Sequence, residues 1–454
     1  MQTAEVSEAA IRAFERVYQT LLREESGMIS EQDISPCQSV PNLDDVANHG
    51  EAFSPELLAQ TVVIKLNGGL GTSMGLQKAK SLLPVRGSAT FLDIIADQII
   101  YLREQTGAKV RFLLMNSFNT SEETLEHMES YADQDLSGAE NIELMQNQIP
   151  KIDAETMEPV VWEQSPSLEW CPPGHGDLYP ALAGSGWLDK LLAEGVKYAF
   201  VSNADNLGAV LSAGLLRYFA QSEHPFLMEA TRRTEADKKG GHLAVRNADN
   251  QLLLREVAQC EDEDLDQFQD IERHQYFNTN SLWIRLDVLK QLLDENDGVL
   301  SLPMIQNKKT VNPRDKKSTP VYQLEVAMGA AIESFPGSGA VCVPRSRFAP
   351  VKTTSDLFAL RSDAYEQTPD GRIALVKSRE GKPPLIDLSD EYKLVDSLEG
   401  LGMPSLLNAN KLTVSGKVRF SDSVTIVGNV SFTNEHEDTK WVAGGTYTDE
   451  DVVL

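Results

Sequence analysis

A glycine-rich stretch directly follows a run of apolar residues. The sequence VVIKLNGGLGTSMGLQKAKSLLPV occupies residues 62–85, and four glycines and two lysines fall within fifteen of its residues. Glycines let backbone N–H groups approach an anion closely, and a lysine ammonium can meet a phosphate as a point charge. The spacing matches neither GxGxxG nor the P-loop pattern. The stretch predicts a phosphate-binding loop of another type; a glycine-rich turn without a ligand is the alternative.

A carboxylate follows a second apolar run. Residues 200–209 read FVSNADNLGA, so Asn203 and Asp205 stand where a buried strand is expected to end. Mg²⁺ prefers oxygen ligands and readily accepts substrate phosphate oxygens. Asp205 is therefore a candidate metal ligand, and a helix-capping role is the alternative.

A histidine lies between two glycines in the segment PPGHGD, residues 172–177. A lone histidine is more often structural than catalytic. Here Gly174 and Gly176 allow the backbone to approach a flat base or a ribose. His175 therefore remains a candidate for contact with a ligand.

Short β-rich runs alternate with helical patterns between about residues 60 and 350. The expected strands are TVVIKL, KVRFLLM, YAFVSN, PFLMEA and GAVCVP, and the expected helices include FLDIIADQIIYLREQTG and LSAGLLRYFAQS. This alternation predicts an α/β fold with a mostly parallel sheet covered on both faces. The candidate residues begin at or just after these strands, where open α/β sheets bind ligands.

The C-terminal residues repeat with a period of six. Leu406, Leu412, Val418, Val424 and Val430 form one apolar series, and Val414, Phe420, Ile426 and Phe432 form a second. Such interleaved series predict a parallel β-helix. An antiparallel meander is the alternative.

The composition excludes several classes of protein. The 454 residues carry 41 basic and 68 acidic side chains, a net charge of −27, which opposes binding to nucleic acids or anionic membranes. The four cysteines form no CxxC pair and indicate reduced thiols. The N-terminal 25 residues resemble an acidic amphipathic helix rather than a signal peptide, and no apolar run is long enough to span a membrane. We expect a cytoplasmic protein.

Nine segments together resemble one enzyme family. LNGGLGTSMG…KS, LLMNSFNT, MQNQIPKI, CPPGHGDLYPAL, FVSNADNLGA, EADKKGGHL, FNTNSLW, VYQLEVAMGAAI and VPRSRFAPVKTTSDL are similar, in order, to segments of the UDP-glucose pyrophosphorylases, the eukaryotic-type UTP–glucose-1-phosphate uridylyltransferases. The resemblance spans roughly residues 60 to 360, and the repetitive tail fits the family too.

The resemblance implies a role for each candidate residue. Lys80 and Lys352 would be the catalytic lysines, and Asp205 would hold Mg²⁺. The implied sugar-binding residues are Gly241, Asn278 and Asn280. The implied nucleotide-binding residues are Leu66, Asn67, Gly68, Gly69, Gly71, Thr72, Gln146, Gly174, His175, Gly176 and Asn203. Gln146 would read uracil, because its amide offers one donor and one acceptor.

The implied reaction is transfer of a uridylyl group from UTP to α-D-glucose 1-phosphate, giving UDP-glucose and pyrophosphate. The sugar phosphate is itself a competent nucleophile, so in-line positioning and charge neutralisation suffice without a general base. The implied fold is a Rossmann-like, GT-A-like nucleotidyltransferase domain with a C-terminal left-handed parallel β-helix, through which copies of the chain could assemble. We expect an N-terminal helical segment (1–55), a catalytic domain (56–360), a connector (361–400) and the β-helix (401–454).

Three departures from the family pattern cluster near the substrate segments. The usual GCKGPKS is GLQKAKS here, so Lys78 competes with Lys80 for the phosphate; KGGTL is KGGHL, with His242; and FNTNN is FNTNS, with Ser281. These changes keep a broad-specificity UDP-sugar pyrophosphorylase open. A non-catalytic UDP-sugar sensor is the alternative from another class.

Two other enzymes fit less well. A UDP-N-acetylglucosamine pyrophosphorylase typically has arginine where Ser73 stands. A hexapeptide-repeat acyltransferase would need a longer repetitive tail and a catalytic histidine.

Overall fold

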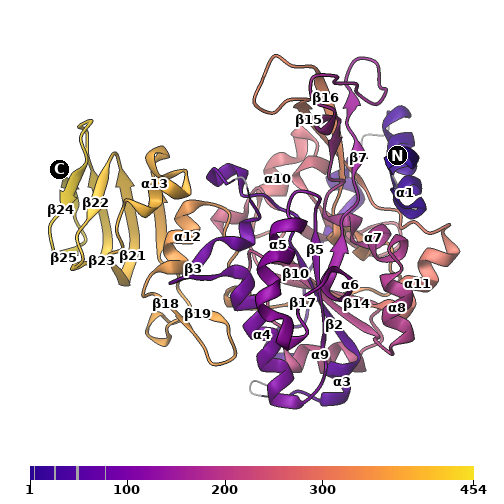
Figure 1. The fold of residues 1–454 in the computed structure, drawn as a ribbon, viewed down its shortest axis with the longest axis horizontal. Coiled ribbons are helices and arrows are strands. Elements are labelled where there is room, and N and C mark those ends of the chain that lie inside the picture. Colours follow the sequence, from indigo (N-terminus) through magenta and orange to yellow (C-terminus); the bar gives the residue numbers. More distant parts are fainter. Residues whose placement is uncertain (5, 25–26, 48–50, 77) are drawn as a thin grey trace.

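The structure is a computed structural model that describes residues 1–4, 6–24, 27–47, 51–76 and 78–454. Figure 1 shows a central α/β body with the N-terminal helix at one end of the long axis and the C-terminal strands at the other.

A ten-stranded mixed sheet forms the centre of the body. Its main order is β17-β11-β14-β10-β2-β5-β6. Strand β12 also pairs with β14, and it pairs in turn with β1 and β13. Strands β10, β2, β5 and β6 are parallel, whereas β14 is antiparallel to β10, β11 and β12. The expected mostly parallel sheet is therefore wrong, because β14 and the strands around β12 pair antiparallel and make the sheet mixed. The strands are β1 (Ile34–Pro36), β2 (Thr61–Leu66), β5 (Arg111–Asn116), β6 (Glu143–Met145), β10 (Tyr198–Asn203), β11 (Phe226–Arg232), β12 (His242–Arg246), β13 (Leu252–Arg255), β14 (Tyr276–Arg285) and β17 (Gly339–Cys342).

Helices cover both faces of this sheet. Val63 of β2 packs in the apolar cluster that includes α4 and α9, whereas Val62 and Ile64 pack in the cluster that includes α7, α8 and α11. This alternation along one strand is what a sheet buried on both sides requires. The helices are α1 (Glu8–Leu22), α2 (Leu43–Val46), α3 (Pro55–Ala59), α4 (Phe91–Thr106), α5 (Ser121–Met128), α6 (Ala139–Ile142), α7 (Leu178–Gly184), α8 (Trp187–Ala193), α9 (Ala213–Gln221), α10 (Leu265–Gln269), α11 (Leu286–Glu295), α12 (Thr354–Arg361) and α13 (Val395–Glu399).

The expected strands and helices of the body are confirmed to within a few residues at their ends. The predicted TVVIKL and YAFVSN runs are β2 and β10, and both predicted helices form as α4 and α9. Local signals fix the ends of α4: Thr90 and Asp93 form a capping box, and Gly107 ends the helix with φ +71°. The elements that position the site are therefore encoded locally.

Smaller sheets surround the central one. A three-stranded sheet projects above it in Figure 1. Its strands are β8 (Ile152–Asp153), β15 (Met304–Thr310) and β16 (Pro320–Val326). The remaining two-stranded pairs of the body are β3 (Pro84–Arg86) with β4 (Ala89–Thr90), β7 (Ile149–Pro150) with β9 (Trp170–Cys171), and β18 (Tyr365–Gln367) with β19 (Ile373–Leu375).

The C-terminal residues form two separate parallel sheets. The five-stranded sheet holds β20 (Leu385–Leu388), β21 (Ser405–Ser415), β23 (Val424–Thr433), β25 (Gly445–Thr448) and β26 (Asp451–Val453), and the two-stranded sheet holds β22 (Val418–Phe420) and β24 (Lys440–Val442). Every strand pair in them is parallel, so the antiparallel meander is wrong. All nine residues of the two apolar series are buried, as their six-residue period predicted.

Two expectations about the whole chain can be compared with this fold. The four cysteines are free and buried, in agreement with the expected reduced thiols. Over the ranges that the structure describes, no helix is both long and apolar enough to cross a membrane.

Candidate active site

A cavity of about 910 Å³ opens at the carboxyl edge of β2 and β10. Parallel strands bring their carboxyl ends to one edge, so the loops after them meet there. The lining residues are Leu66, Asn67, Gly68, Gly69, Lys80, Ser81, Met115, Gln146, Pro172, Gly174, His175, Asn203, Ala204 and Asp205. Most of the predicted nucleotide-side residues, the loop lysine and the candidate metal ligand therefore share one cavity.

The glycine-rich loop is closed at its base by backbone pairing. Leu70 and Ala79 form an antiparallel bridge, and the Lys80 N–H donates to the Gly69 carbonyl at 3.3 Å. This pairing puts Lys80 at the cavity wall. Lys78 is exposed and is not among the lining residues. The loop geometry thus separates the two lysines that the sequence left in competition.

Lys80 and Asp205 form an ion pair inside the cavity. The lysine Nζ lies 2.6 Å from Asp205 Oδ2, and both side chains are mostly buried. The other carboxylate oxygen, Asp205 Oδ1, is buried and has no hydrogen-bond partner among the described residues. A buried anionic oxygen without a donor suits a cation.

The chain alone does not build a complete metal cage. Within the described part of the chain, no group of three or more His, Cys, Asp or Glu side chains could hold a metal ion. Asp205 can therefore supply one ligand, and the remaining ligands would have to be substrate oxygens and water, as is usual for Mg²⁺.

The segment after β9 forms another wall of the cavity. The Gln146 amide donates to the Gly174 carbonyl at 2.9 Å. Gly174 has φ +81°, and a Cβ there would lie 2.6 Å from the Val326 carbonyl oxygen, so only glycine fits. His175 Nδ1 accepts from the Met328 N–H, and burial lowers the pKa of His175 to about 4. The neutral imidazole thus keeps Nε2–H as a donor.

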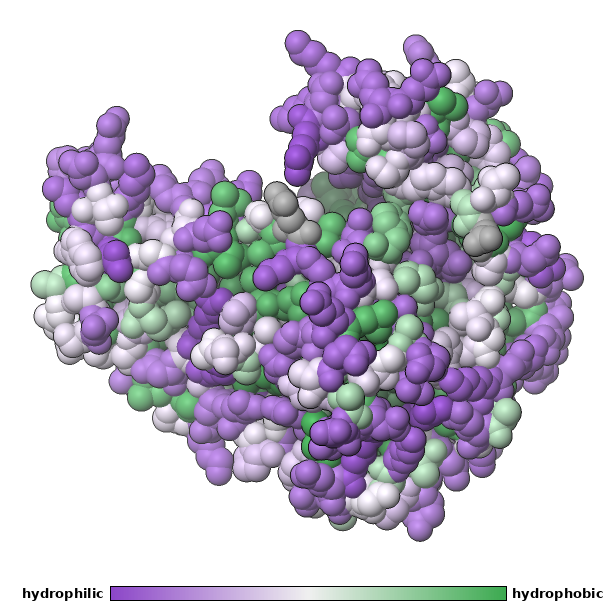
Figure 2. All heavy atoms as spheres, in the orientation of Figure 1, coloured by the Kyte–Doolittle hydropathy of each residue, from purple (hydrophilic) through white to green (hydrophobic). Residues whose placement is uncertain are grey.

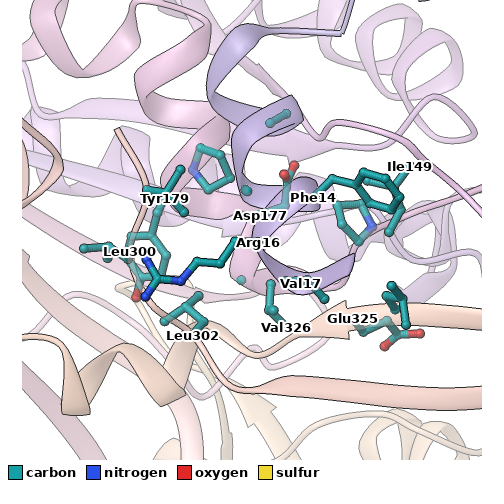
Figure 3. A pocket seen from close by; sticks show the side chains of 17 residues that line it. Phe14, Arg16, Val17, Ile149, Asp177, Tyr179, Leu300, Leu302, Glu325 and Val326 are labelled. Carbon is teal, nitrogen blue, oxygen red and sulfur yellow. The ribbon is translucent and has the colours of Figure 1, made fainter. Parts of the chain in front are cut away.

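Asp177 at the end of this segment lies next to a different cavity. Its carboxylate accepts from the backbone and side-chain N–H groups of Asn147, and burial raises the pKa of Asp177 to about 7. Figure 3 shows this cavity, about 570 Å³, with Phe14 of α1 beside Ile149 and Arg16 of α1 near Tyr179. Its lining is mainly apolar, with one cationic side chain, Arg16, against two acidic ones, Asp177 and Glu325, so it suits a triphosphate poorly.

The predicted sugar-side residues Gly241, Asn278 and Asn280 line neither the nucleotide cavity nor the wider cavity beside it. Asn278 donates to the Asn280 side chain at 2.8 Å and accepts from its backbone N–H at 2.9 Å. Lys352 is exposed and lines a wider cavity of about 1650 Å³ with Gly240 and Phe277. Figure 2 shows a hollow between the lobe that carries β15 and β16 and the C-terminal lobe.

Glu256 is a candidate that the sequence analysis missed. It follows β13 directly, and burial raises its pKa, whereas the nearby Lys352 and the Gly241 N–H oppose that shift. A Cβ on Gly241 would lie 2.6 Å from the carboxylate of Glu256. The available signal is the same as for Asp205, a carboxylate directly after a strand.

Several predicted residues lie outside the nucleotide cavity. Gly71 and Thr72 are in the glycine loop but not among the lining residues, and Gly176 lines the apolar cavity beneath α1 instead. Asn67, by contrast, lines the cavity, and its buried amide donates to Asn116 of β5 and Thr124 of α5, which holds the loop in place.

Two of the sequence departures are buried. His242 stacks on His274 with ring centroids 3.8 Å apart, and its side chain is fully buried. Ser281 is fully buried in β14. Neither side chain is among those lining the two larger cavities.

Comparisons with known proteins agree on one family. The family model described as UTP--glucose-1-phosphate uridylyltransferase matches residues 11–427. The enzyme of that name from Solanum tuberosum is 41% identical over 384 residues, 84% of this chain and 78% of its own length.

Solved structures extend the similarity to the whole chain. A UDP-glucose phosphorylase from Trypanosoma brucei is 50% identical with a TM-score of 0.91, covering 100% of this chain and 98% of its own. A UDP-glucose pyrophosphorylase variant from Leishmania major, solved in complex with UDP-glucose, is 44% identical with a TM-score of 0.93, over 100% and 98% of the two chains.

Proposed function

Because the chain belongs to the UTP–glucose-1-phosphate uridylyltransferase family, we propose that its cavity transfers the uridylyl group of UTP to α-D-glucose 1-phosphate. The products are UDP-glucose and pyrophosphate. The observation that carries this proposal is the convergence of the glycine loop, Lys80, Asp205 and His175 on one cavity.

On the nucleotide side, the backbone of Gly68 and Gly69 approaches the phosphates of UTP. Gln146 and the segment around Gly174 hold the uracil and ribose, with His175 as a neutral donor. Lys80 leaves Asp205 and neutralises phosphate charge once the triphosphate is bound. The other nucleotide contacts that we propose are at Leu66, Asn67, Gly71, Thr72, Gly176 and Asn203.

We also propose Mg²⁺ as the cofactor, with Asp205 as its protein ligand. The free, buried Oδ1 of Asp205 supports this assignment. When bound, the ion supplies positive charge to the phosphate oxygens and the departing pyrophosphate.

The chain's contribution to the chemistry is positioning and electrostatics. The phosphate of glucose 1-phosphate attacks the α-phosphorus in line with the departing pyrophosphate, so the new P–O bond forms as the bond to pyrophosphate breaks. Lys352 steadies the sugar phosphate and the charge that develops in the transition state. No proton has to be removed from the nucleophile near neutral pH, so no general base is required.

Glucose is held by polar groups on the sugar side. Asn278, Asn280 and the backbone at Gly241 can bond its hydroxyls, and Glu256 adds an acceptor beside them. His242 and Ser281 are buried, so neither change presents a new side chain to the two larger cavities. This favours glucose over a broad range of sugars.

The test measures pyrophosphate release from UTP in the presence of Mg²⁺. Glucose 1-phosphate, galactose 1-phosphate and N-acetylglucosamine 1-phosphate are supplied in separate, parallel reactions. Turnover with glucose 1-phosphate alone is expected. Comparable rates with several sugars would establish the broad-specificity enzyme instead. UTP binding without turnover on any sugar would establish the sensor.

We propose that the C-terminal sheets are faces of one parallel β-helix spanning residues 401–454. Leu412 pairs with Val430 and Val414 with Phe432, in each case three six-residue repeats further along, which supports this assignment. The other proposed segments are 1–55, 56–360 and 361–400. Trp441 and Val453 are exposed in the last strands and could meet a second copy. The proposed compartment is the cytoplasm.

A further inference from the structure

Two loops that carry proposed active-site residues lie against each other. The first, residues 204–210, follows β10 and contains Asp205; the second, residues 343–352, follows β17 and ends at Lys352. The Val351 N–H donates to the Asp205 carbonyl at 3.0 Å, so the residue before Lys352 is bonded directly to Asp205.

The side chain of Asn206 joins the two loops. Its Nδ2 donates to the Arg347 carbonyl at 3.1 Å, and its Oδ1 accepts from the Ala349 N–H at 3.1 Å and the Gly208 N–H at 3.2 Å. The side chain is buried, at 2% exposure. One amide thus satisfies backbone groups on both loops, and buried groups left unpaired would be costly.

The loops also approach each other too closely for an ordinary side chain. A Cβ on Gly208 would lie 2.4 Å from the Ser346 carbonyl oxygen. Nearby, the Arg347 guanidinium donates to the Val210 carbonyl at 2.9 Å. The contact is therefore a packed junction rather than a single hydrogen bond.

Buried charges anchor this junction to the sheet. Arg347 makes a two-bond pair with Glu229 of β11 at 2.7 and 2.8 Å, and Trp283 of β14 donates to the same carboxylate. Lys65 of β2 donates to the Ala209 carbonyl at 2.7 Å. Both loops are thus fixed to rigid strands, and Asn206 closes the gap between them.

We propose that Asn206 is a positioning residue that sets the placement of Lys352 relative to Asp205. The inference rests on the proposed roles of those two residues. Asparagine suits the position because its amide supplies a donor and an acceptor on a short stem. Displacement of a catalytic group by about 1 Å can cost about a hundredfold in rate, so loosening this junction is expected to reduce turnover.

The first test measures the junction itself by hydrogen exchange. Asn206→Ala is expected to speed amide exchange across residues 345–352. The matched control is Asn434→Ala, because Asn434 is also a buried amide that donates to two backbone carbonyls, of Lys417 and Asp438, and accepts from a backbone N–H. It should leave residues 345–352 unchanged. Unchanged exchange in Asn206→Ala would overturn the inference.

The second test is a double-mutant cycle on turnover. Asn206→Ala is expected to lower kcat roughly 10- to 100-fold in the otherwise unchanged chain, but only by about twofold when Lys352→Ala is already present, because it acts through Lys352. Asn434→Ala should have the same small effect in both backgrounds. Equal fold-losses of Asn206→Ala in the two backgrounds would overturn the positioning role.

The cycle separates failure of the inference from failure of the proposed function. Normal turnover by Lys352→Ala alone would remove the proposed role of Lys352 and, with it, the role of Asn206. If Lys352→Ala strongly lowers kcat but Asn206→Ala lowers kcat by the same factor in both backgrounds, only the proposed role of Asn206 is wrong. If Asn206→Ala does not fold, Asn206→Asp serves in the same cycle, since it keeps the two accepted bonds and loses the donor to Arg347.

Discussion

The nucleotide side and the sugar side of the proposed site are built differently. On the nucleotide side, the loops after β2, β9 and β10 already share one cavity, and Lys80 and Asp205 touch. On the sugar side, Asn278 and Asn280 satisfy each other, and Lys352 is exposed in a separate, wider cavity. The nucleotide-side groups therefore already line one cavity, whereas the proposed sugar-side groups are bonded to each other or lie in a different cavity.

Lys80→Ala should give the largest effect. It removes the cation that the fold places beside Asp205, and loss of such a preorganised group typically costs about 10²–10³ in turnover. Steady-state pyrophosphate release measures it. Lys78→Ala is the matched control, two residues away and exposed, and should stay within about threefold of the unchanged protein. The reverse ranking would transfer the role to Lys78.

Asp205→Asn should impair metal use. The substitution keeps an acceptor for Lys80 but removes the charge at the unpartnered Oδ1. The Mg²⁺ concentration for half-maximal activity is expected to rise at least about tenfold, a loss typical even for outer-shell partners of a metal. Titration with Mg²⁺ after chelation measures this shift. An unchanged requirement would show that the metal is held elsewhere.

Two glycine substitutions should separate the two sides. Gly241→Ala would push against the Glu256 carboxylate, so KM for glucose 1-phosphate should rise roughly tenfold while KM for UTP changes little. At Gly69, no atom of the described residues lies within 4 Å of the position that an alanine Cβ would take. Gly69→Ala should therefore keep its stability and raise only the KM for UTP. Identical KM patterns for the two variants would contradict the division.

The smallest effect concerns the pH dependence of stability. Because burial raises the pKa of Asp177 to about 7, the folded state binds this proton more tightly than the unfolded chain. Its contribution to stability is complete below about pH 4 and is lost as the pH rises through 7. The free energy of unfolding of Asp177→Asn should thus gain on the order of 2–3 kcal/mol relative to the unchanged protein between pH 5 and pH 8.

Denaturant unfolding at the two pH values measures this difference. The exposed Asp133→Asn is the control and should show no such gain. A gain of equal size in both variants would contradict the assignment to Asp177.

Features coded by neighbouring residues could be predicted from the sequence. The β2 strand, the capped helix α4 and the buried six-residue series follow from local periodicity and turn residues. The partners in the site could not be predicted this way. The Lys80–Asp205 pair and the junction at Asn206 join residues far apart in the chain, and no local pattern marks which of their loops will be neighbours.

The buried apolar cluster on one face of the sheet has a consequence for synthesis. It runs without a break from β2 and α4 through α12 and α13 into β21, β23 and Val442. Chains emerge from the ribosome N-terminus first, so this cluster cannot close until the last strands have been made. A chain that stops before β21 is therefore expected to expose apolar surface on α12 and α13 and to become a substrate for chaperones.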